Sequence, residues 1–176
     1  MPNRGSRDVI DSFLLRRIRS GSNVLDVGSG YGETALLIAR RVPGATVEAV
    51  DIDAASVHRA NRRFRRLDRS RPIRCRRGNA EELARTFGRS RFDCVVVNNA
   101  LHEFWRPVRA LRETRSVLRP GGMLLLAEFT PRYGEQADDC PRYSCEKIIE
   151  LTRRAGFAVR SAATRSDAIL IRATKR

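Results

Sequence analysis

The stretch NVLDVGSGYGET, residues 23–34, restricts the possible folds of this chain more than any other segment. In it, a short apolar run leads through a glycine loop into the start of a helix. Three glycines stand at alternate positions in the loop: Gly28, Gly30 and Gly32. Without a Cβ at these positions, a ligand can lie close against the backbone. The flanking carboxylates of Asp26 and Glu33 would repel a pyrophosphate, the ligand of the related G-x-G-x-x-G spacing. The loop therefore predicts a ligand with positive charge, such as an adenosyl compound bearing a sulfonium and an ammonium.

Short apolar runs alternate with helical patterns along the rest of the chain. We expect strands at residues 24–27, 46–52, 72–77, 92–98, 123–129, 157–163 and 168–174. We expect helices at residues 6–18, 34–42, 54–67, 81–87, 106–118 and 144–155. Such alternation favours a parallel sheet with helices on both faces. The prediction is a single-domain α/β fold, Rossmann-like and doubly wound, whose seven-stranded, mostly parallel sheet ends in a C-terminal antiparallel hairpin. An N-terminal helix occupies residues 1–20, and the main domain residues 21–176.

Length and composition restrict the class of protein. The 176 residues suffice for one domain with a sizeable core, and 41% of them are hydrophobic. The sequence contains no apolar run of 18 residues and therefore predicts no membrane span, and its N-terminus lacks an apolar signal core. We therefore expect a cytoplasmic protein. Cys75 and Cys94 fall in strand-like runs and are expected to be reduced core thiols, whereas the role of Cys140 and Cys145 stays open. We expect no metal.

Basic residues give the chain a formal net charge of +15. From Arg59 to Arg91 there are 13 arginines and three acids. A field of this strength can attract RNA or another polyanion. An arginine-rich surface without a specific partner is the alternative, since charge alone selects no ligand.

Five motifs stand in an order and at separations that resemble one enzyme family. They are VLDVGSGYG (24–32), VEAVDID (47–53), GNAEEL (78–83), FDCVVVNNALHEF (92–104) and LRPGGMLLLAEF (118–129). Over about residues 20–175, the chain resembles the class I S-adenosylmethionine-dependent methyltransferases. Its LHEF segment resembles the type-11 and quinone-biosynthesis branch. The resemblance implies S-adenosylmethionine as cofactor and an enzyme of class EC 2.1.1.

The resemblance also implies a set of cofactor-binding residues. They are Asp26, Gly28, Ser29, Gly30, Gly32, Asp51, Ile52, Asn79, Ala80 and Asn98. Asp51 would accept hydrogen bonds from both ribose hydroxyls, although Asp53 stands two residues on and could serve instead, or cap the next helix. Asn79 replaces the family's usual aspartate at the adenine, and a simple turn role for it stays open. Asp26 would face the cationic end of the cofactor, or else cap the strand end.

The acceptor should lie over the ends of the fourth and fifth strands. His102 is the candidate general base, because histidine exchanges protons near neutral pH, but it could instead pack and hydrogen-bond. Possible acceptor contacts are Asn99, Glu103, Tyr133 and Tyr143, whereas Trp105 is interpreted as a packing residue. Neither D/N-P-P-Y/F nor a Pro-Cys dipeptide after the fourth strand is present, which disfavours the nucleic-acid base chemistries that use them.

The short N-terminal helix and the modest insertion after the fifth strand favour a small-molecule acceptor. The pocket could also be completed by a second subunit, so a homodimer is possible. Two alternatives stay open. One is a methyltransferase of RNA or of a ribosome-associated protein, and the other is a non-catalytic partner subunit that binds the cofactor.

Overall fold

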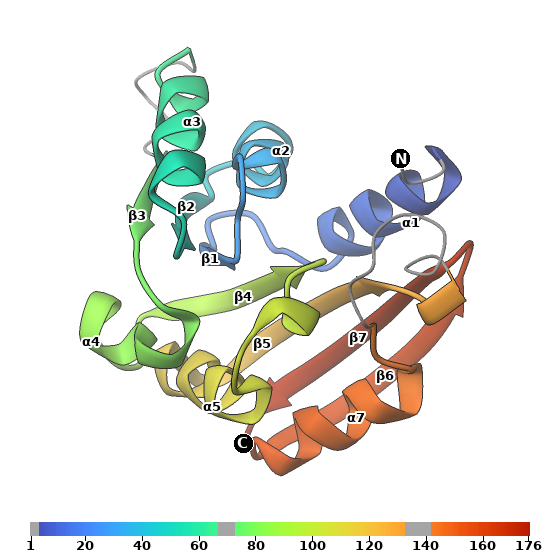
Figure 1. Cartoon of the computed structure of the whole chain (residues 1–176). Coiled ribbons are helices and arrows are strands. Elements are labelled where there is room, and N and C mark those ends of the chain that lie inside the picture. The colour runs from blue at the N-terminus through green and yellow to red at the C-terminus, as the bar shows by residue number, and fades with distance from the viewer. Residues whose placement is uncertain (1–3, 67–72, 133–141) are drawn as a thin grey trace.

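The structure is a computed structural model, and it describes residues 4–66, 73–132 and 142–176. Seven strands form one sheet in the order β3-β2-β1-β4-β5-β7-β6 (Figure 1). The strands are β1 (Asn23–Val27), β2 (Thr46–Asp51), β3 (Ile73–Arg77), β4 (Phe92–Asn98), β5 (Leu118–Phe129), β6 (Phe157–Arg165) and β7 (Ala168–Lys175). The first five are parallel, and β7 pairs antiparallel with both β5 and β6. The predicted fold class, including the C-terminal hairpin, is confirmed.

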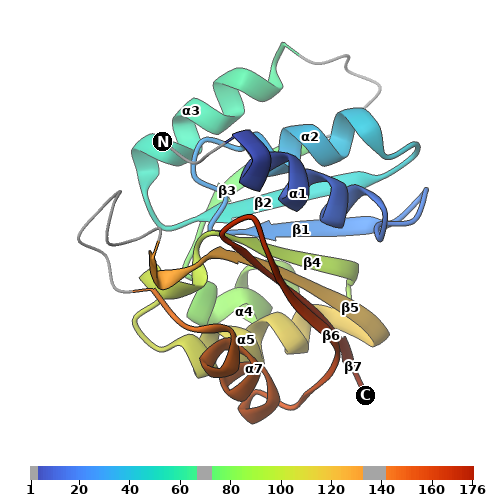
Figure 2. The ribbon, with the colours of Figure 1, turned by 90° about the vertical axis from the view of Figure 1, so that its right-hand side faces the viewer.

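Helices cover both faces of the sheet (Figure 2). One face carries α1 (Arg4–Leu15), α2 (Glu33–Arg41) and α3 (Ala54–Phe64). The other carries α4 (Leu83–Phe87), α5 (Pro107–Val117) and α7 (Cys145–Arg154). Two 3-10 turns, η1 (Ala80–Glu82) and η2 (Leu101–Glu103), follow β3 and β4. Each face has its own core, because alternate side chains of a strand point to opposite faces: Val24 packs under α1 and α2, whereas Leu25 and Val27 pack toward α4 and α5.

The N-terminal helix, which we expected as a region at residues 1–20, packs directly on the sheet. Its apolar stripe consists of Ile10, Phe13 and Leu14, and with Ile18 it joins the same core as α2, α3 and the sheet. The helix expected to begin at Ser6 begins at Arg4, so Ser6 lies inside α1, where it donates its hydroxyl to the carbonyl of Ser166 in the turn between β6 and β7. Among the described residues, every helix is too short or too polar to span a bilayer.

A few predicted boundaries shift. The strand expected at residues 123–129 begins earlier, at Leu118, and β5 has an irregular register opposite Phe92 and Cys94. The helix expected at 106–118 ends at Val117, where the backbone becomes extended. Cys75 and Cys94 are buried free thiols, and burial raises the pKa of both. Cys140 lies outside the described residues.

Candidate functional site

Two adjoining cavities open at the carboxyl ends of β1, β2 and β4, where ligands bind in open α/β sheets. The smaller cavity has a volume of about 180 Å³ and is lined by Asp51, Ile52, residues 78–81 and residues 103–105. The larger cavity, of about 730 Å³, lies between the glycine loop, α1, α2 and the ends of β4 and β5. Gly28 borders both cavities, so one extended ligand can occupy them together.

The glycine loop holds a backbone shape that other residues rarely adopt. Gly28, Gly30 and Gly32 all have positive φ, at 71°, 51° and 77°. A Cβ on Gly28 would lie 2.5 Å from Ala100 Cβ, and one on Gly32 would lie 2.5 Å from the Phe64 ring. A Cβ on Gly30 would meet no atom of the protein within 4 Å, so that side of the loop faces open space. Gly28 and Gly32 therefore permit close packing of the loop, and Gly30 borders space that a ligand can fill.

Asp51 lines the smaller cavity and also organises the loop beside it. Its Oδ2 accepts a hydrogen bond from Gly30 N at 2.7 Å, and its Oδ1 accepts one from Asp53 N at 2.9 Å. Asp53 caps α3 by accepting from Ala55 N and Ser56 N, at 3.3 and 2.8 Å. Hydrogen bonding from the Ser56 side chain and from these two amides lowers the pKa of Asp53. Of the two aspartates, Asp51 borders the cavity and Asp53 has the capping role.

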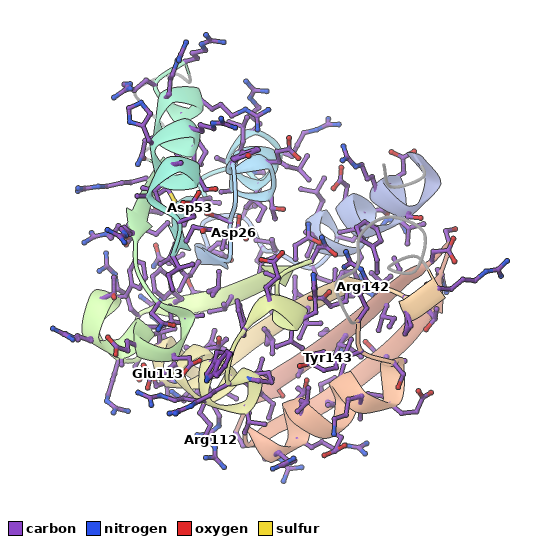
Figure 3. All side chains as sticks on the ribbon, in the orientation of Figure 1. Asp26, Asp53, Arg112, Glu113, Arg142 and Tyr143 are labelled. Atoms are coloured by element: carbon purple, nitrogen blue, oxygen red, sulfur yellow. The ribbon has the colours of Figure 1, made fainter. Side chains whose placement is uncertain are left out.

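Asp26 lies behind the loop. Its side chain is 1% exposed, lines neither of the two cavities, and accepts a hydrogen bond from Ala35 N at 3.1 Å, near the start of α2 (Figure 3). Burial raises the pKa of Asp26 to about 7. The second carboxylate of the sequence argument, Glu33, is exposed and pairs with Arg63 at 3.2 Å. Asp26 thus takes the position of the strand-end cap, and its predicted contact with a cationic ligand has no geometric support here.

The residues expected around an adenine lie in the wall of the smaller cavity. Asn79 caps η1 by accepting from Glu81 N at 2.8 Å, which is the turn role that had stayed open, and it also lines the cavity with Ala80. Ile52 is exposed at the cavity edge. Trp105, interpreted from the sequence as a packing residue, is 88% exposed on the same edge, so that interpretation was wrong.

The end of β4 places two asparagines in the wall of the larger cavity. Asn98 Nδ2 donates to Thr34 Oγ1 at 2.9 Å, while the buried Oδ1 has no hydrogen-bond partner within residues 4–66, 73–132 and 142–176. Asn99 has a positive φ of 52°, a conformation in which asparagine is enriched among non-glycine residues. Its side-chain oxygen accepts from Arg142 Nη1 at 2.6 Å. An unpaired buried acceptor is costly, so Asn98 Oδ1 marks a place for a donor group of a ligand.

A buried charged cluster lies beside the larger cavity. Glu128, near the end of β5 and 1% exposed, accepts from Leu101 N at 2.6 Å and from His102 Nδ1 at 2.7 Å. Arg142 Nη1 lies 3.9 Å from the same carboxylate. Since a carboxylate only accepts, His102 Nδ1 carries the hydrogen and Nε2 lies toward Glu103, 3.8 Å away. The His102 side chain is 1% exposed and lines neither cavity.

The remaining predicted acceptor contacts are scattered. Glu103 borders the smaller cavity, not the larger one. Tyr143 is partly buried against the core under α7 and lines neither cavity, and Tyr133 lies outside the described residues. Sequence reasoning missed Glu128 and Arg142. Glu128 could have been found as a charge inside the apolar run MLLLAEF, whereas Arg142 has no signal among so many arginines.

Comparisons with known proteins decide the family. Residues 24–122 match the family model of the methyltransferase domain. An uncharacterized methyltransferase of Mycobacterium tuberculosis is 40% identical over 120 residues, which are 68% of this chain and 57% of that protein. The demethylmenaquinone methyltransferase of Thermus thermophilus is 33% identical over 128 residues, which are 73% of this chain and 55% of that protein. This chain belongs to the class I S-adenosylmethionine-dependent methyltransferase family.

The fold of this methyltransferase agrees with that of solved relatives. The crystal structure of a SAM-dependent methyltransferase from Aquifex aeolicus superposes with a TM-score of 0.83 at 19% identity, covering 97% of this chain and 89% of that one. At that identity the likeness concerns the fold alone. The methyltransferase chain spans about half the length of the curated relatives it matches.

The two cavities fit S-adenosylmethionine on structural grounds. Asp51 and the exposed apolar edge of Ile52 and Trp105 suit an adenosine in the smaller cavity. The open side of Gly30 and the unpaired Asn98 Oδ1 suit the methionine part, whose ammonium is a hydrogen-bond donor. Among the described residues, no group of three His, Cys, Asp or Glu side chains could hold a metal ion.

Proposed function

We propose that this methyltransferase transfers a methyl group from S-adenosylmethionine to a small-molecule acceptor bound in the larger cavity. The observation that carries the proposal is the pair of cavities joined at Gly28, the smaller lined by Asp51 and Asn79 and the larger open beside Asn98. When bound, S-adenosylmethionine supplies a methyl carbon on a sulfonium; the acceptor's nucleophile bonds to that carbon, and the carbon–sulfur electron pair stays on sulfur.

The chain's own residues bind and orient the reactants. Asp51 accepts hydrogen bonds from the ribose hydroxyls, and Asn98 Oδ1 accepts one from the methionine ammonium. Charge-assisted hydrogen bonds of this kind are worth about 1.5–3 kcal/mol each. Because the sulfonium already provides the leaving group, alignment of the two reactants accounts for most of the rate that a protein can add.

His102 acts as a positioning residue in this proposal. Its ring is enclosed beside Glu128 and lines neither cavity, so a direct proton transfer from an acceptor would require it to move. The Glu128 carboxylate joins His102 to Leu101 N and thereby holds η2 against the end of β5. This contact supports the wall of the smaller cavity, because η2 leads directly into residues 103–105. The same carboxylate lies 3.9 Å from Arg142, which lines the larger cavity.

The kinship with a demethylmenaquinone methyltransferase supports a small acceptor. A second candidate acceptor is RNA, and one observation favours it: exposed arginines continue from α3 onto the edge strand β3. They are Arg59, Arg62, Arg63, Arg65, Arg66, Arg74 and Arg77. If RNA is the acceptor, its binding should weaken steeply as salt is raised, and methyl label should appear in an RNA pool.

The experiment is to incubate the full chain with methyl-labelled S-adenosylmethionine and a fractionated cell extract. Label in small-molecule fractions supports the proposal, and label in RNA or protein selects the second candidate. Binding is followed separately by the emission of Trp105, the single tryptophan of the chain, which lies at the edge of the smaller cavity. A change in emission without labelling of any fraction would favour a non-catalytic partner that only binds the cofactor.

A further inference from the structure

We propose that the outer face of α3 binds single-stranded RNA. The inference concerns binding alone, so it does not depend on which acceptor is methylated. Exposed arginines stand at the spacing i, i+3, i+4 and i+7, which places side chains on one face of a helix: Arg59, Arg62, Arg63 and Arg66. This face lies at one end of the sheet, beside the edge strand β3 (Figure 1).

Few acids offset the arginines of α3 and β3. Glu33 pairs with Arg63 at 3.2 Å, and Glu48 pairs with Arg76 at 3.1 Å. Asp53, the N-cap of α3, interacts electrostatically with Arg59. Five exposed arginines of this segment form no ion pair with a described residue: Arg62, Arg65, Arg66, Arg74 and Arg77.

The sequence limits any further offset of this charge. From Arg59 through Arg77 it contains ten arginines and a single acid, Asp68, which lies outside the described residues. One carboxylate can neutralise only one of the five arginines that have no ion pair with a described residue. The outer face of α3 and the adjoining edge strand therefore keep an excess of positive charge, which attracts a polyanion.

The kind and arrangement of these cations suit phosphates along a strand. No lysine stands between Arg59 and Arg91, and a guanidinium can bind two phosphate oxygens at once, which an ammonium does not. Helical spacing, at about 1.5 Å per residue, spreads the cations from Arg59 to Arg66 over about 10 Å. Such a row can follow successive phosphates, whereas a single small anion would contact only part of it.

Tyr31 places an aromatic ring next to the arginines. Its ring centroid lies 5.0 Å from the guanidinium carbon of Arg59, and its carbonyl accepts a hydrogen bond from Arg63 Nη1 at 3.3 Å. Tyr31 is 48% exposed, so a base of a bound strand can stack on its ring. Stacking of this kind needs bases that are free of a partner strand, which is typical of single-stranded RNA.

A membrane surface is the other anionic partner that a basic helix could bind. A helix that lies on a bilayer inserts large apolar side chains into it. Among the described residues, the exposed large hydrophobic side chains are those of Tyr31, Ile52 and Trp105, and none of them belongs to α3. The outer face of α3 therefore lacks the apolar contacts that a membrane requires.

The test measures the binding of a fluorescein-labelled uridine oligomer to the full chain by fluorescence anisotropy. The oligomer has about 20 nucleotides, which is longer than a typical single-strand site. We expect a dissociation constant below about 10 µM at about 100 mM NaCl, and a steep loss of affinity as salt is raised. Absence of binding under these conditions would overturn the proposal.

Two double variants locate the surface. Arg62→Gln with Arg66→Gln should weaken binding at least about tenfold and reduce the slope of log affinity against log salt by more than about one. The matched control is Arg112→Gln with Arg153→Gln, two exposed arginines of α5 and α7 on the other face of the sheet (Figure 3). It removes the same charge and should change the affinity by less than about threefold. Equal losses in the two variants would show that only net charge attracts RNA, and would overturn the proposal.

A third variant tests for a single strand. Tyr31→Ala should weaken binding of the oligomer at least about fivefold without changing its salt dependence, because stacking is not ionic. Binding of a DNA duplex of the same length should be unaffected by Tyr31→Ala. An equal effect on both probes, or none on the oligomer, would overturn the assignment to a single strand. Binding to phosphatidylserine vesicles with none to the oligomer would assign the surface to a membrane instead.

Discussion

Asp51 and Asp53 are two residues apart and have different partners. Asp51 borders the smaller cavity and holds Gly30 N, whereas Asp53 holds the first turn of α3. The difference follows from where β2 ends. Asp51 is the last residue of β2 and lies at the carboxyl end of the sheet, beside the cavity, whereas Asp53 directly precedes α3 and is its N-cap.

We expect Asp51→Ala to lower the affinity for S-adenosylmethionine at least about tenfold, because each lost charge-assisted hydrogen bond is worth about 1.5–3 kcal/mol. Asp53→Ala is the matched control. It should lower the stability slightly through the lost cap and change the affinity by less than about twofold. Titration of Trp105 emission measures both variants, and equal affinities in the two would contradict the ribose role of Asp51.

Asp26 should make stability depend on pH. Its pKa in the folded chain is raised from 3.8 to about 7, so between these values the folded state keeps a proton that the unfolded state has released. Stability therefore falls as the pH rises through this window, by the linkage of proton binding to unfolding. We expect Asp26→Asn, which can still accept from Ala35 N, to lessen that fall. Urea unfolding at pH 5 and pH 7.5 measures it, and identical pH dependence in both proteins would count against the shift.

At the scale of elements, the buried Glu128 joins β5 to η2. The carboxylate accepts hydrogen bonds from the Leu101 N–H and from His102 Nδ1, which would otherwise bond to water. These two bonds hold the loop after β4 against the end of β5. The same loop carries Trp105 to the smaller cavity. A core contact between two elements thus determines the shape of the site.

His102→Ala should leave the affinity for S-adenosylmethionine within about twofold of the original, since the ring lines neither cavity. It should lower stability by about 1–3 kcal/mol, because Glu128 loses a buried hydrogen-bond partner. The other histidine of the chain, His58, is exposed on α3, so His58→Ala serves as the control for stability.

Kinetics then separate positioning from proton transfer. If His102 is a positioning residue, His102→Ala should mainly raise the KM of the acceptor, because the Glu128 carboxylate that loses His102 lies 3.9 Å from Arg142 in the wall of the larger cavity. The shape of the pH–rate profile should be kept. Loss of the ascending limb of that profile in His102→Ala, with an unchanged KM, would instead assign the general-base role to His102.

At the scale of the whole molecule, α1 is part of the core and of the site together. Leu14 is fully buried against the sheet, while Arg7, Ile10 and Asp11 of the same helix line the larger cavity. Folding of the core and formation of the cavity wall are therefore coupled.

Leu14→Ala should destabilise the protein by about 2–5 kcal/mol, the usual range for a buried leucine cut to alanine. Unfolding should stay a single transition if α1 and the rest of the chain form one cooperative unit. Arg16→Ala, exposed near the end of α1, should change stability by less than about 0.5 kcal/mol. Two separate transitions in the unmodified protein would show that α1 is an independent region.

Most of the fold could be predicted because each element carries its own local signal. The run FDCVVVN is apolar throughout, as a central parallel strand requires, and the glycine loop marks the turn from β1 into α2. The site could be predicted only in outline. Asp51, Asn79 and Ala80 do line the smaller cavity, but the placement of Asp26 depends on its depth behind the loop, which no spacing in the sequence encodes.

Local pattern alone therefore determined the order of strands and helices, the position of the glycine loop and the family of this methyltransferase. Tertiary structure decided which charges meet. Glu128 and His102 are 26 residues apart, and Arg142 reaches Asn99 across 43 residues. Only the folded sheet brings these groups to hydrogen-bonding distance and removes them from water. Burial and proximity set the strength of an electrostatic interaction, and both are properties of the packed chain.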